Sequence, residues 1–294
     1  MEIKLLKTIE EYTSLTIHEL SEHLNQNSLQ TLSQIAHIME IAPDLIKSDN
    51  GKYQLSKQLN WLNREKLKTS LAANNHPLVI LDSIPSTNSY ALENINTLAD
   101  KTIISCDWQY AGRGRFERRW LSTIAHDLTV SFVYHFERDI NILLLPLVSA
   151  IAVNRLLKNQ SIKNKIKWPN DIYVDQQKVA GILVESRISS DKSKVVIGVG
   201  LDNFKNWERN QLLIDLAAVL DNIISEFVLF GFALIRREWL DNCMHLNEEV
   251  TLIENGSEIA KGIHHDIGTN GELIIKIQNQ LQSYSSSLIS LKTK

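Results

Sequence analysis

The sequence has little of the features that would mark several specialised classes of protein. Its two cysteines, Cys106 and Cys243, are too few for a disulfide scaffold and too far apart for a zinc-knuckle pair, which favours a reducing cytoplasm. The net charge of −3 excludes a globally basic nucleic-acid coat, though not a local basic patch. The most apolar run, Ile142 to Val153, is shorter than the ~18 residues of a membrane span. The N-terminus has an early acidic residue and no long apolar core, so we expect no secretory signal.

The length of 294 residues and the composition fit a globular protein with two or three domains, at ~150 residues per domain. Apolar residues of segment 1–66 recur at helical spacing, and Thr16 with Glu19 forms a capping-box pattern. Asn50-Gly51 between two extended pieces predicts a hairpin. Three short helices and a hairpin are the outline of a winged helix-turn-helix, and a small helical packing or dimerisation unit is the alternative.

The rest of the chain changes pattern twice. A polar connector is expected at 67–77, and strands then alternate with helices up to about residue 247, which predicts a mixed α/β domain with an antiparallel part. From residue 248 the pattern is all strand, with turns at Asn255-Gly256 and Asn270-Gly271. This predicts a small β-barrel of about five strands. The expected domains are therefore 1–66, 67–247 and 248–294.

The segment from Gln109 to Trp120 combines two glycines with four arginines. Glycine lets the backbone turn tightly, and arginine binds phosphate and carboxylate through a two-pronged guanidinium group. The segment therefore suits a flexible clamp on an anionic ligand. It lacks the Gly-Lys-Ser/Thr end of a P-loop and the third glycine of a dinucleotide fingerprint. An exposed basic loop, solvated or bound to RNA, is the alternative.

Three further segments have both a functional and a plain interpretation. Asn170 and Asp171 lie between two short strands and are either site residues or turn formers, and the nearby Lys178 is either functional or an ordinary surface lysine. Ser86-Thr87-Asn88 begins a helix and is either a cap or part of an anion site. Gly198-Val199-Gly200 ends a strand, where the glycines could simply mark a bulge.

Taken together and in this order, these segments resemble the biotin protein ligases. The landmarks are Ser-Thr-Asn, Gly-Arg-Gly-Arg with a following Trp, Lys-Trp-Pro-Asn-Asp, Lys-Val-Ala-Gly-Ile-Leu-Val-Glu and Gly-Val-Gly. The resemblance covers 78–294 well and 1–66 in outline. It implies an α+β fold with an N-terminal winged helix-turn-helix, a central mixed-sheet catalytic domain of the class II synthetase and biotin ligase kind, and a C-terminal SH3-like β-barrel. The long form of the family also represses biotin synthesis genes.

The resemblance implies a two-step reaction: ATP, with Mg²⁺ held through its phosphates rather than by a side-chain cluster, activates biotin to biotinyl-5′-AMP. A lysine on the biotin carboxyl carrier domain of acetyl-CoA carboxylase then accepts the biotinyl group. It also implies site residues in three groups. The catalytic group is Lys178, Arg113, Arg115 and Asp171. The biotin-binding group is Ser86, Thr87, Asn88, Gln109, Gly112, Arg113, Gly114, Arg115, Lys178, Gly181 and Leu183. The ATP-binding group is Arg115, Trp120, Asn170, Lys178, Asn203 and Lys292.

The sequence departs from the family pattern at several positions. Phe116 and Glu117 replace small or basic loop residues, Asp202 stands where asparagine is usual, and Lys292 replaces a frequent arginine. In the tail, serines at 285–287 stand where glycines and an acid are common. We therefore expect a retained fold with altered affinity for ATP.

Segment 1–66 holds seven Lys/Arg and nine Asp/Glu, and the expected recognition helix, Ser28 to Ile41, has no Lys or Arg. Because DNA binding leans on phosphate contacts by such residues, operator binding is expected to be weak or absent. A sensor-type repressor and a lipoate-type ligase are the alternative functions. A homodimer is implied by the resemblance alone, and no membrane partner is expected.

Overall fold

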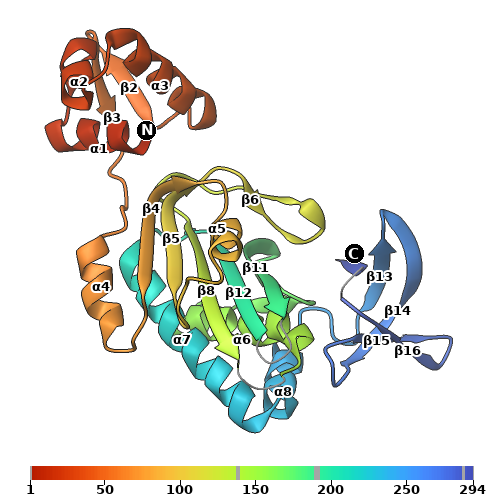
Figure 1. Cartoon of the computed structure of the whole chain (residues 1–294). Helices are drawn as coiled ribbons and strands as arrows, with labels where there is room; N and C mark the ends of the chain where they lie inside the picture. Colours follow the sequence, from red (N-terminus) through yellow and green to blue (C-terminus); the bar gives the residue numbers. More distant parts are fainter. Residues whose placement is uncertain (1, 137–139, 189–192, 287–288, 294) are drawn as a thin grey trace.

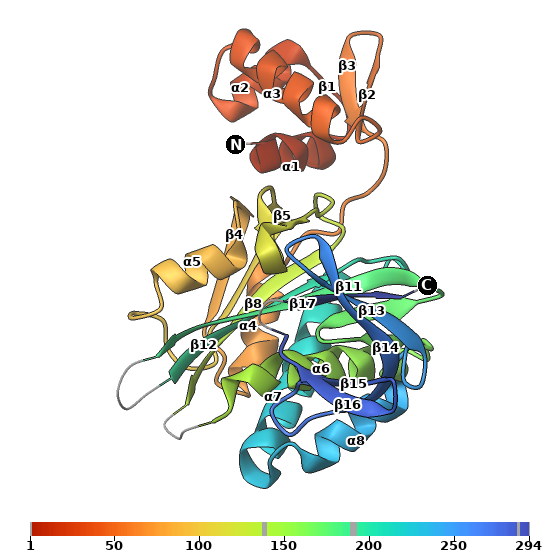
Figure 2. The same cartoon turned by 90° about the vertical axis from the view of Figure 1, so that its right-hand side faces the viewer.

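The computed structural model describes residues 2–136, 140–188, 193–286 and 289–293, which form three units in chain order (Figures 1 and 2). The N-terminal unit lies at one end of the molecule. Residues 56–63, which have neither helix nor strand, join it to a central unit built on a seven-stranded sheet. A five-stranded C-terminal sheet lies beside the central unit.

The N-terminal unit contains the predicted helices and hairpin. Its capping box is present, with Thr16 accepting the backbone N–H of Glu19 at 3.3 Å. The hairpin turn is also present, with Asn50 and Gly51 at φ angles of 48° and 72°. The helices are α1 (Glu2–Tyr12), α2 (Ile17–Leu24) and α3 (Ser28–Ile41), and the sheet has the order β1-β3-β2 with β1 (Leu15–Thr16), β2 (Ile46–Asp49) and β3 (Lys52–Leu55).

Helix α1 fastens this unit to the central one. The ammonium group of Lys7 lies 3.0 Å from Oδ2 of buried Asp107 and 2.8 Å from Oδ1 of Asp82. Asp107 in turn pairs with fully buried Arg209 at 3.0 Å. The apolar core of the N-terminal unit includes Ile124 and Ala125 from the central chain. The two units therefore share both a charge network and a hydrophobic contact.

The central sheet is mixed. Strands β4 and β5 are parallel, and the other neighbouring pairs are antiparallel. Its strand order is β4-β5-β8-β12-β11-β10-β9. The strands are β4 (Leu78–Ile84), β5 (Ile103–Gln109), β8 (Leu128–Phe136), β9 (Lys165–Lys167), β10 (Asp171–Val174), β11 (Gln177–Ile188) and β12 (Ser193–Leu201).

Helices cover both faces of this sheet. Helix α5 (Thr87–Glu93) packs on β5, β8 and β12, and the N-cap is Ser86, as the sequence indicated. Helices α6 (Leu145–Asn159) and α7 (Arg209–Phe230) pack together on the opposite face, with α8 (Ala233–Asn242) beside α6. A short 3₁₀ turn, Ile142–Leu144, leads into α6. The helical stretch 142–159 is long and apolar enough to cross a membrane, but 67% of it is buried in this fold, as a core helix would be.

The polar connector expected at 67–77 is wrong for its first half. Residues Arg64–Ala72 form helix α4, which Asn63 caps through a 2.9 Å bond to the N–H of Lys66. Leu67 and Leu71 are buried in the main core against α7 and β4. Two apolar residues four positions apart suffice to dock a helix whose remaining positions are polar, which is why composition alone suggested a connector.

The C-terminal sheet has the order β16-β15-β14-β13-β17. Its strand β16 lies outside the four apolar runs, 250–253, 259–263, 273–277 and 288–291, from which the sequence predicts strands. The β15–β16 hairpin turns at Gln278-Asn279, both with positive φ, and not at an Asn-Gly pair. Apolar residues of the C-terminal sheet, such as Leu252 and Ile275, belong to the same core cluster as Trp239 of α8. The strands are β13 (Glu249–Glu254), β14 (Ser257–Ile267), β15 (Leu273–Ile277), β16 (Gln280–Tyr284) and β17 (Ile289–Thr293).

Candidate functional site

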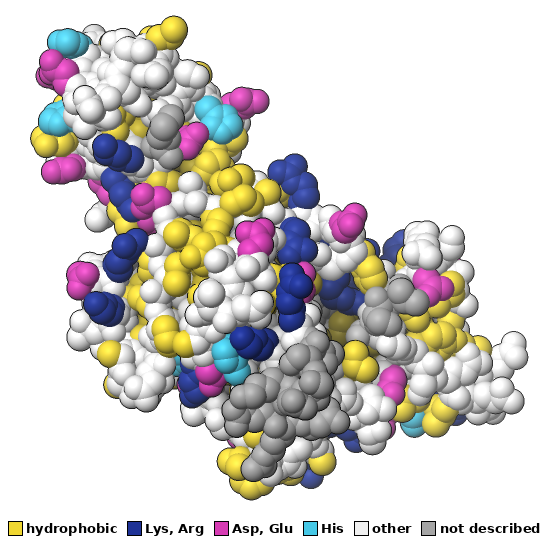
Figure 3. All heavy atoms as spheres, in the orientation of Figure 1, with side chains coloured by type: hydrophobic (Ala, Val, Ile, Leu, Met, Phe, Trp, Pro, Cys, Tyr) yellow, Lys and Arg dark blue, Asp and Glu magenta, His cyan; other side chains and the backbone are white. Residues whose placement is uncertain are grey.

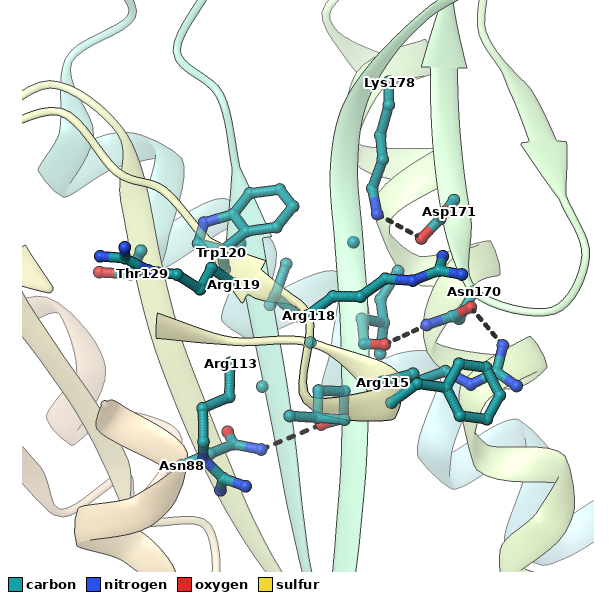
Figure 4. Close-up of a pocket in the computed structure, with 18 of the residues that line it drawn as sticks. Asn88, Arg113, Arg115, Arg118, Arg119, Trp120, Thr129, Asn170, Asp171 and Lys178 are labelled. Atoms are coloured by element: carbon teal, nitrogen blue, oxygen red, sulfur yellow. Dashed lines mark hydrogen bonds and ion pairs between the residues drawn. The ribbon is translucent and has the colours of Figure 1, made fainter. Parts of the chain in front are cut away.

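Most of the predicted site residues line one pocket of about 300 Å³ on the central unit (Figure 4). Strands β8, β11 and β12 and the start of α5 form one side of it. The arginine loop, between the short strands β6 (Gly112–Arg113) and β7 (Arg119–Trp120), lies across it. Residues 167–171 and strand β17 complete the wall, so the pocket lies where the central and C-terminal units meet. On the face shown in Figure 3, basic side chains gather along the central unit toward the C-terminal unit.

One end of the pocket carries a buried hydrogen-bond network of uncharged side chains, and the partly exposed Arg113–Glu185 ion pair lies beside it. Oε1 of Gln109 accepts from the backbone N–H of Thr87 at 2.9 Å and from its hydroxyl at 3.2 Å. The Ser131 hydroxyl lies 2.6 Å from Oδ1 of Asn88, whose Nδ2 donates to the carbonyl of Leu183 at 3.2 Å. Fixed, desolvated donors and acceptors of this kind orient a polar but uncharged part of a ligand.

The other end carries cations, of which Arg115 is the most buried. Its guanidinium group donates to Oδ1 of Asn170 at 3.3 Å, to the carbonyl of Ile289 at 3.0 Å, and to the carbonyl of Ser286. Burial lowers the pKa of Arg115 to about 10, which leaves it charged at neutral pH. Because most of its partners are neutral, its charge remains available to an anion.

Lys178 and Asp171 form an ion pair beside this arginine, with Nζ 2.8 Å from Oδ1. The same ammonium group lies 5.4 Å from the ring centroid of Trp120, within cation–π range. Figure 4 shows Arg118 extending from the loop toward Asp171. Burial also lowers the pKa of Lys167, and the nearby positive charges of Lys178 and Arg118 add to that shift. A concentration of positive charge that outweighs one carboxylate favours a polyanion here.

Three glycines keep the floor open. A Cβ on Gly200 would lie 2.3 Å from the ring of Trp120, and one on Gly198 would lie 2.2 Å from Oδ1 of Asn88. A Cβ on Gly181 would lie 3.1 Å from both Nζ of Lys178 and the Trp120 ring. Strand β12 pairs without a register shift on either side, so Gly198 and Gly200 do not mark a bulge. They make room for side chains that shape the pocket.

Comparisons with known proteins agree with this geometry. The model of the biotin/lipoate A/B protein ligase family matches residues 80–202. The bifunctional ligase/repressor BirA of Escherichia coli (strain K12) is 28% identical over 300 residues, covering 94% of this chain and 92% of that protein. A biotin protein ligase structure from Aquifex aeolicus in complex with biotin and ATP superposes with a TM-score of 0.63 at 25% identity, covering 74% of this chain and 99% of that one.

The chain belongs to the biotin protein ligases. A plant relative, the chloroplastic biotin–protein ligase 1 of Arabidopsis thaliana, is 31% identical over 69% of this chain and 54% of that protein. The mixed central sheet predicted from the sequence is that of the ligase catalytic domain.

The structure separates two arginines of this ligase that the sequence grouped together. Arg113 lies beside the network of uncharged groups, where its Nη2 is 3.0 Å from Oε2 of Glu185 and its Nε donates to Ser89 at 3.1 Å. Arg115 reaches the opposite, cationic end. The predicted residues found on the pocket wall are Ser86, Thr87, Asn88, Gln109, Arg113, Gly114, Arg115, Trp120, Asn170, Asp171, Lys178, Gly181 and Leu183.

Three predicted site residues of the ligase lie off the described pocket wall. Asn203 is buried, and its side chain bonds to the backbone of Trp207 at 2.8 and 2.9 Å. Lys292 is exposed on β17, although its neighbours Ser290 and Leu291 line the pocket. Gly112 lies in β6 at the start of the loop, where a Cβ would lie 2.4 Å from Nε2 of Gln109. Ser287 and the Leu288 that follows it lie outside the described residues.

Other wall residues of the ligase had no site role assigned from the sequence. Lys167 and Trp168 stood inside a quoted motif without an assigned role, and Arg118 was counted only as part of a basic loop. Thr129 carried no usable signal, because its place follows from strand β8 lying next to β12. The remaining wall residues not assigned are Phe116, Arg119, Val130, Pro169, Tyr173, Ile182, Gly198, Val199, Gly200, Ser290 and Leu291.

Proposed function

We propose that the protein activates biotin with ATP and then transfers the biotinyl group to a lysine of the biotin carboxyl carrier domain of acetyl-CoA carboxylase. The observation that carries this proposal is a single pocket that joins a wall of uncharged hydrogen-bonding groups to a cluster of cations. Biotin has an uncharged ureido head and a carboxylate tail, and the triphosphate of ATP is a polyanion. The two ends of the pocket suit these ligands in that order.

In the first step a carboxylate oxygen of biotin attacks the α-phosphorus of ATP, and pyrophosphate leaves. In the second step the amine of the acceptor lysine attacks the acyl carbon, AMP leaves, and the amine loses a proton. Neither step needs a nucleophile from the enzyme. The pocket must hold two anions together and stabilise the charge on the phosphorus centre, which Arg115 and Lys178 are placed to do.

The pocket residues divide into roles along this path. Thr87 and Gln109 would bind the ureido head, with Ser86 and Asn88 supporting them and Gly181 and Leu183 lining the ring pocket. Trp120 would pack against the adenylate. The remaining cations and the Asn170 amide would hold the nucleotide. Arg113 and Gly114 would let the loop close over the intermediate.

The donor set fits a Mg²⁺ ion held mainly by the phosphates of ATP. Asp171 is the single carboxylate among the described residues of the pocket wall, and carboxylate and phosphate oxygens are the ligands that this ion prefers. Asp171 would supply one oxygen. When bound, the ion would neutralise phosphate charge as pyrophosphate departs.

For the whole chain we propose three domains near the predicted bounds, with the first boundary in the segment 56–63, because α4 packs into the central core. The N-terminal unit would be a winged helix-turn-helix and the C-terminal sheet an SH3-like barrel. Helix α3 leaves Leu29 and Met39 exposed and has no Lys or Arg, so the winged helix would bind an operator weakly or not at all. A homodimer remains part of the proposal.

The proposal is tested by measuring biotin-dependent exchange of labelled pyrophosphate into ATP, followed by transfer of labelled biotin to a purified carrier domain. We expect both activities, and we expect lipoate to support neither. Transfer of lipoate without transfer of biotin would show that the substrate assignment is wrong.

A further inference from the structure

A second cluster of titratable side chains lies outside the described pocket wall. Cys243, His245 and His264 are all buried, at the junction of α8 with the C-terminal sheet. The Cys243 sulfur lies 3.5 Å from Nδ1 of His245 and 3.6 Å from Nδ1 of His264, and the two nitrogens are 3.0 Å apart. Spacings of this size would suit either three ligands of one tetrahedral metal ion or a hydrogen-bonded chain.

One backbone contact decides between these two interpretations. The N–H of Trp168 donates to Nε2 of His245 at 3.0 Å, so this nitrogen is unprotonated. A neutral imidazole then carries its proton on Nδ1, the atom that would have to hold the metal. Metal-bound histidines normally donate a proton from the nitrogen that is not coordinated. His245 accepts there instead, which argues against a metal ion.

The hydrogen bonds instead form a chain with one consistent direction. Trp168 N–H donates to His245 Nε2, and His245 Nδ1–H donates to His264 Nδ1. His264 Nε2–H then donates to the backbone carbonyl of Asp266 at 3.1 Å. Each ring nitrogen of the two histidines has a partner of the matching kind. Burial lowers the pKa of both rings, so both are neutral at pH 7, as this chain requires.

The hydrogen-bond chain connects the pocket to the C-terminal sheet. Trp168 begins the segment Trp168-Pro169-Asn170-Asp171, which lines the cationic end of the pocket. Its indole N–H also donates to the carbonyl of Gly271 at 3.1 Å. Asp266 lies on β14 and forms an ion pair with Arg236 of α8. Trp168 is therefore held through its backbone and its side chain by the C-terminal unit and the α8 region.

We propose that His245 and His264 are positioning residues, which fix the segment 168–171 against β14 and so set the position of Asn170 and Asp171 at the nucleotide end of the pocket. This inference rests on the proposed function for its activity readout. It assigns the C-terminal sheet a part in binding ATP, in addition to the contacts that β17 makes with Arg115.

Two substitutions of His245 separate the two halves of the hydrogen-bond chain. In His245→Gln the amide oxygen can reach the place of Nε2 and accept from Trp168. In His245→Asn the shorter amide can reach only the place of Nδ1, toward His264. We expect His245→Asn to raise the KM for ATP about tenfold and His245→Gln to stay within about threefold. The KM for biotin should change less than about twofold in both, because its proposed site lies at the other end of the pocket.

Exposed His265 provides the control, and His265→Gln should match the unaltered protein. Both variants at position 245 lose one hydrogen bond, so both should lower the melting temperature similarly. A role limited to stability would therefore give the two variants the same KM for ATP. That result, or an equal rise in the KM values for ATP and biotin, would overturn the proposal.

Two measurements test the hydrogen-bond chain without relying on enzymatic activity. Long-range ¹H–¹⁵N spectra of the full-length protein should show His245 protonated on Nδ1 and His264 protonated on Nε2. Titration with Co²⁺ should give no thiolate-to-metal absorption band. The opposite tautomer for His245, or a stoichiometric band that Cys243→Ser removes, would make the cluster a metal site. If pyrophosphate exchange is absent while the tautomers are as expected, the proposed function fails and the hydrogen-bond chain stands.

Discussion

The ammonium nitrogen of Lys178 lies 2.8 Å from Oδ1 of Asp171, so the lysine that we place at the reacting phosphate is already paired with a carboxylate. Both side chains are partly exposed, and an ion pair in such a setting contributes little to stability, about 0–1 kcal/mol. An incoming polyanion can therefore draw Lys178 away from Asp171 at small cost. The pair would keep the lysine oriented in the pocket until ATP arrives.

Replacement of Lys178 by alanine should separate catalysis from folding. We expect Lys178→Ala to lower the rate of adenylate formation more than tenfold, a loss of more than ~1.4 kcal/mol of transition-state stabilisation. The free energy of unfolding should change by less than about 1 kcal/mol. Pyrophosphate exchange and urea titration provide the two measurements. Lys276→Ala, at an exposed lysine on β15, is the matched control, and exchange by Lys178→Ala within tenfold of the unaltered rate would contradict the assigned role.

The contact between Gly200 and Trp120 predicts a pairwise effect. A Cβ at position 200 would lie 2.3 Å from the indole, so Gly200→Ala must displace the ring, and overpacking of this kind costs about 1–3 kcal/mol. In a Trp120→Ala background the methyl group would enter the space that the ring has left. The same substitution should then cost less. Unfolding free energies of the four proteins in this cycle measure the coupling, and a coupling near zero would show that the ring does not press on Gly200.

The buried histidine pair predicts a loss of stability in acid. Burial lowers the pKa of His245 to about 3 and that of His264 to about 4, against about 6.5 in an unfolded chain. At pH values between the folded-state and unfolded-state pKa values, the two histidines bind protons in the unfolded chain but not in the folded one. Their contribution to stability is therefore complete above about pH 6.5 and falls as the pH drops toward 4.

Urea titrations at pH 7 and pH 5 measure this loss. The charged groups around the pair, Lys167 near His245 and Asp266 and His265 near His264, act in opposite directions and do not reverse the sign. His245→Gln should reduce the dependence on pH, because glutamine does not titrate. An unchanged dependence in that variant would assign the acid sensitivity to other groups.

Helix α4 should be necessary for the stability of the central unit. Leu67 is fully buried in the main core, and truncation of a buried leucine to alanine costs about 2–5 kcal/mol. We expect Leu67→Ala to fall in this range. Lys68→Ala, at the exposed neighbouring position, should stay within about 0.5 kcal/mol of the unaltered protein. Denaturant unfolding measures both, and equal effects would mean that α4 is loosely attached.

The elements that could be predicted were those with local signals. Thr16 and Glu19 cap α2 as expected, and Asn50-Gly51 forms its turn, because capping and positive φ are decided within a few residues. Helix α4 and strand β16 were missed for the opposite reason. Helix α4 has only two buried leucines among polar residues, so its sequence shows little helical periodicity. The turn before β16 is formed by Gln278-Asn279 and contains no glycine, so it lacks the usual sequence signal of a hairpin.

The site residues likewise divide into those with a local sequence signal and those placed by contacts between distant segments. Ordered motifs contain most of the residues of the pocket wall, but they could not show that Arg113 and Arg115 face opposite ends, since that depends on Glu185 and on β17 arriving from distant parts of the chain. Asn203 looked like a ligand contact and turned out to bond to the backbone at Trp207. The contact between His245 and His264 joins an α8 terminus to a strand of another unit, which no local pattern records.

The shared core of the N-terminal unit has a practical consequence. Ile124 and Ala125 follow the arginine loop closely in the chain, yet they are covered by residues from the first 60 positions. A shortened protein that starts after residue 55 would leave this apolar pair facing water and Asp107 without its lysine partner. Such a fragment would tend to self-associate, so its behaviour in the laboratory would be a poor guide to the catalytic power of the complete chain.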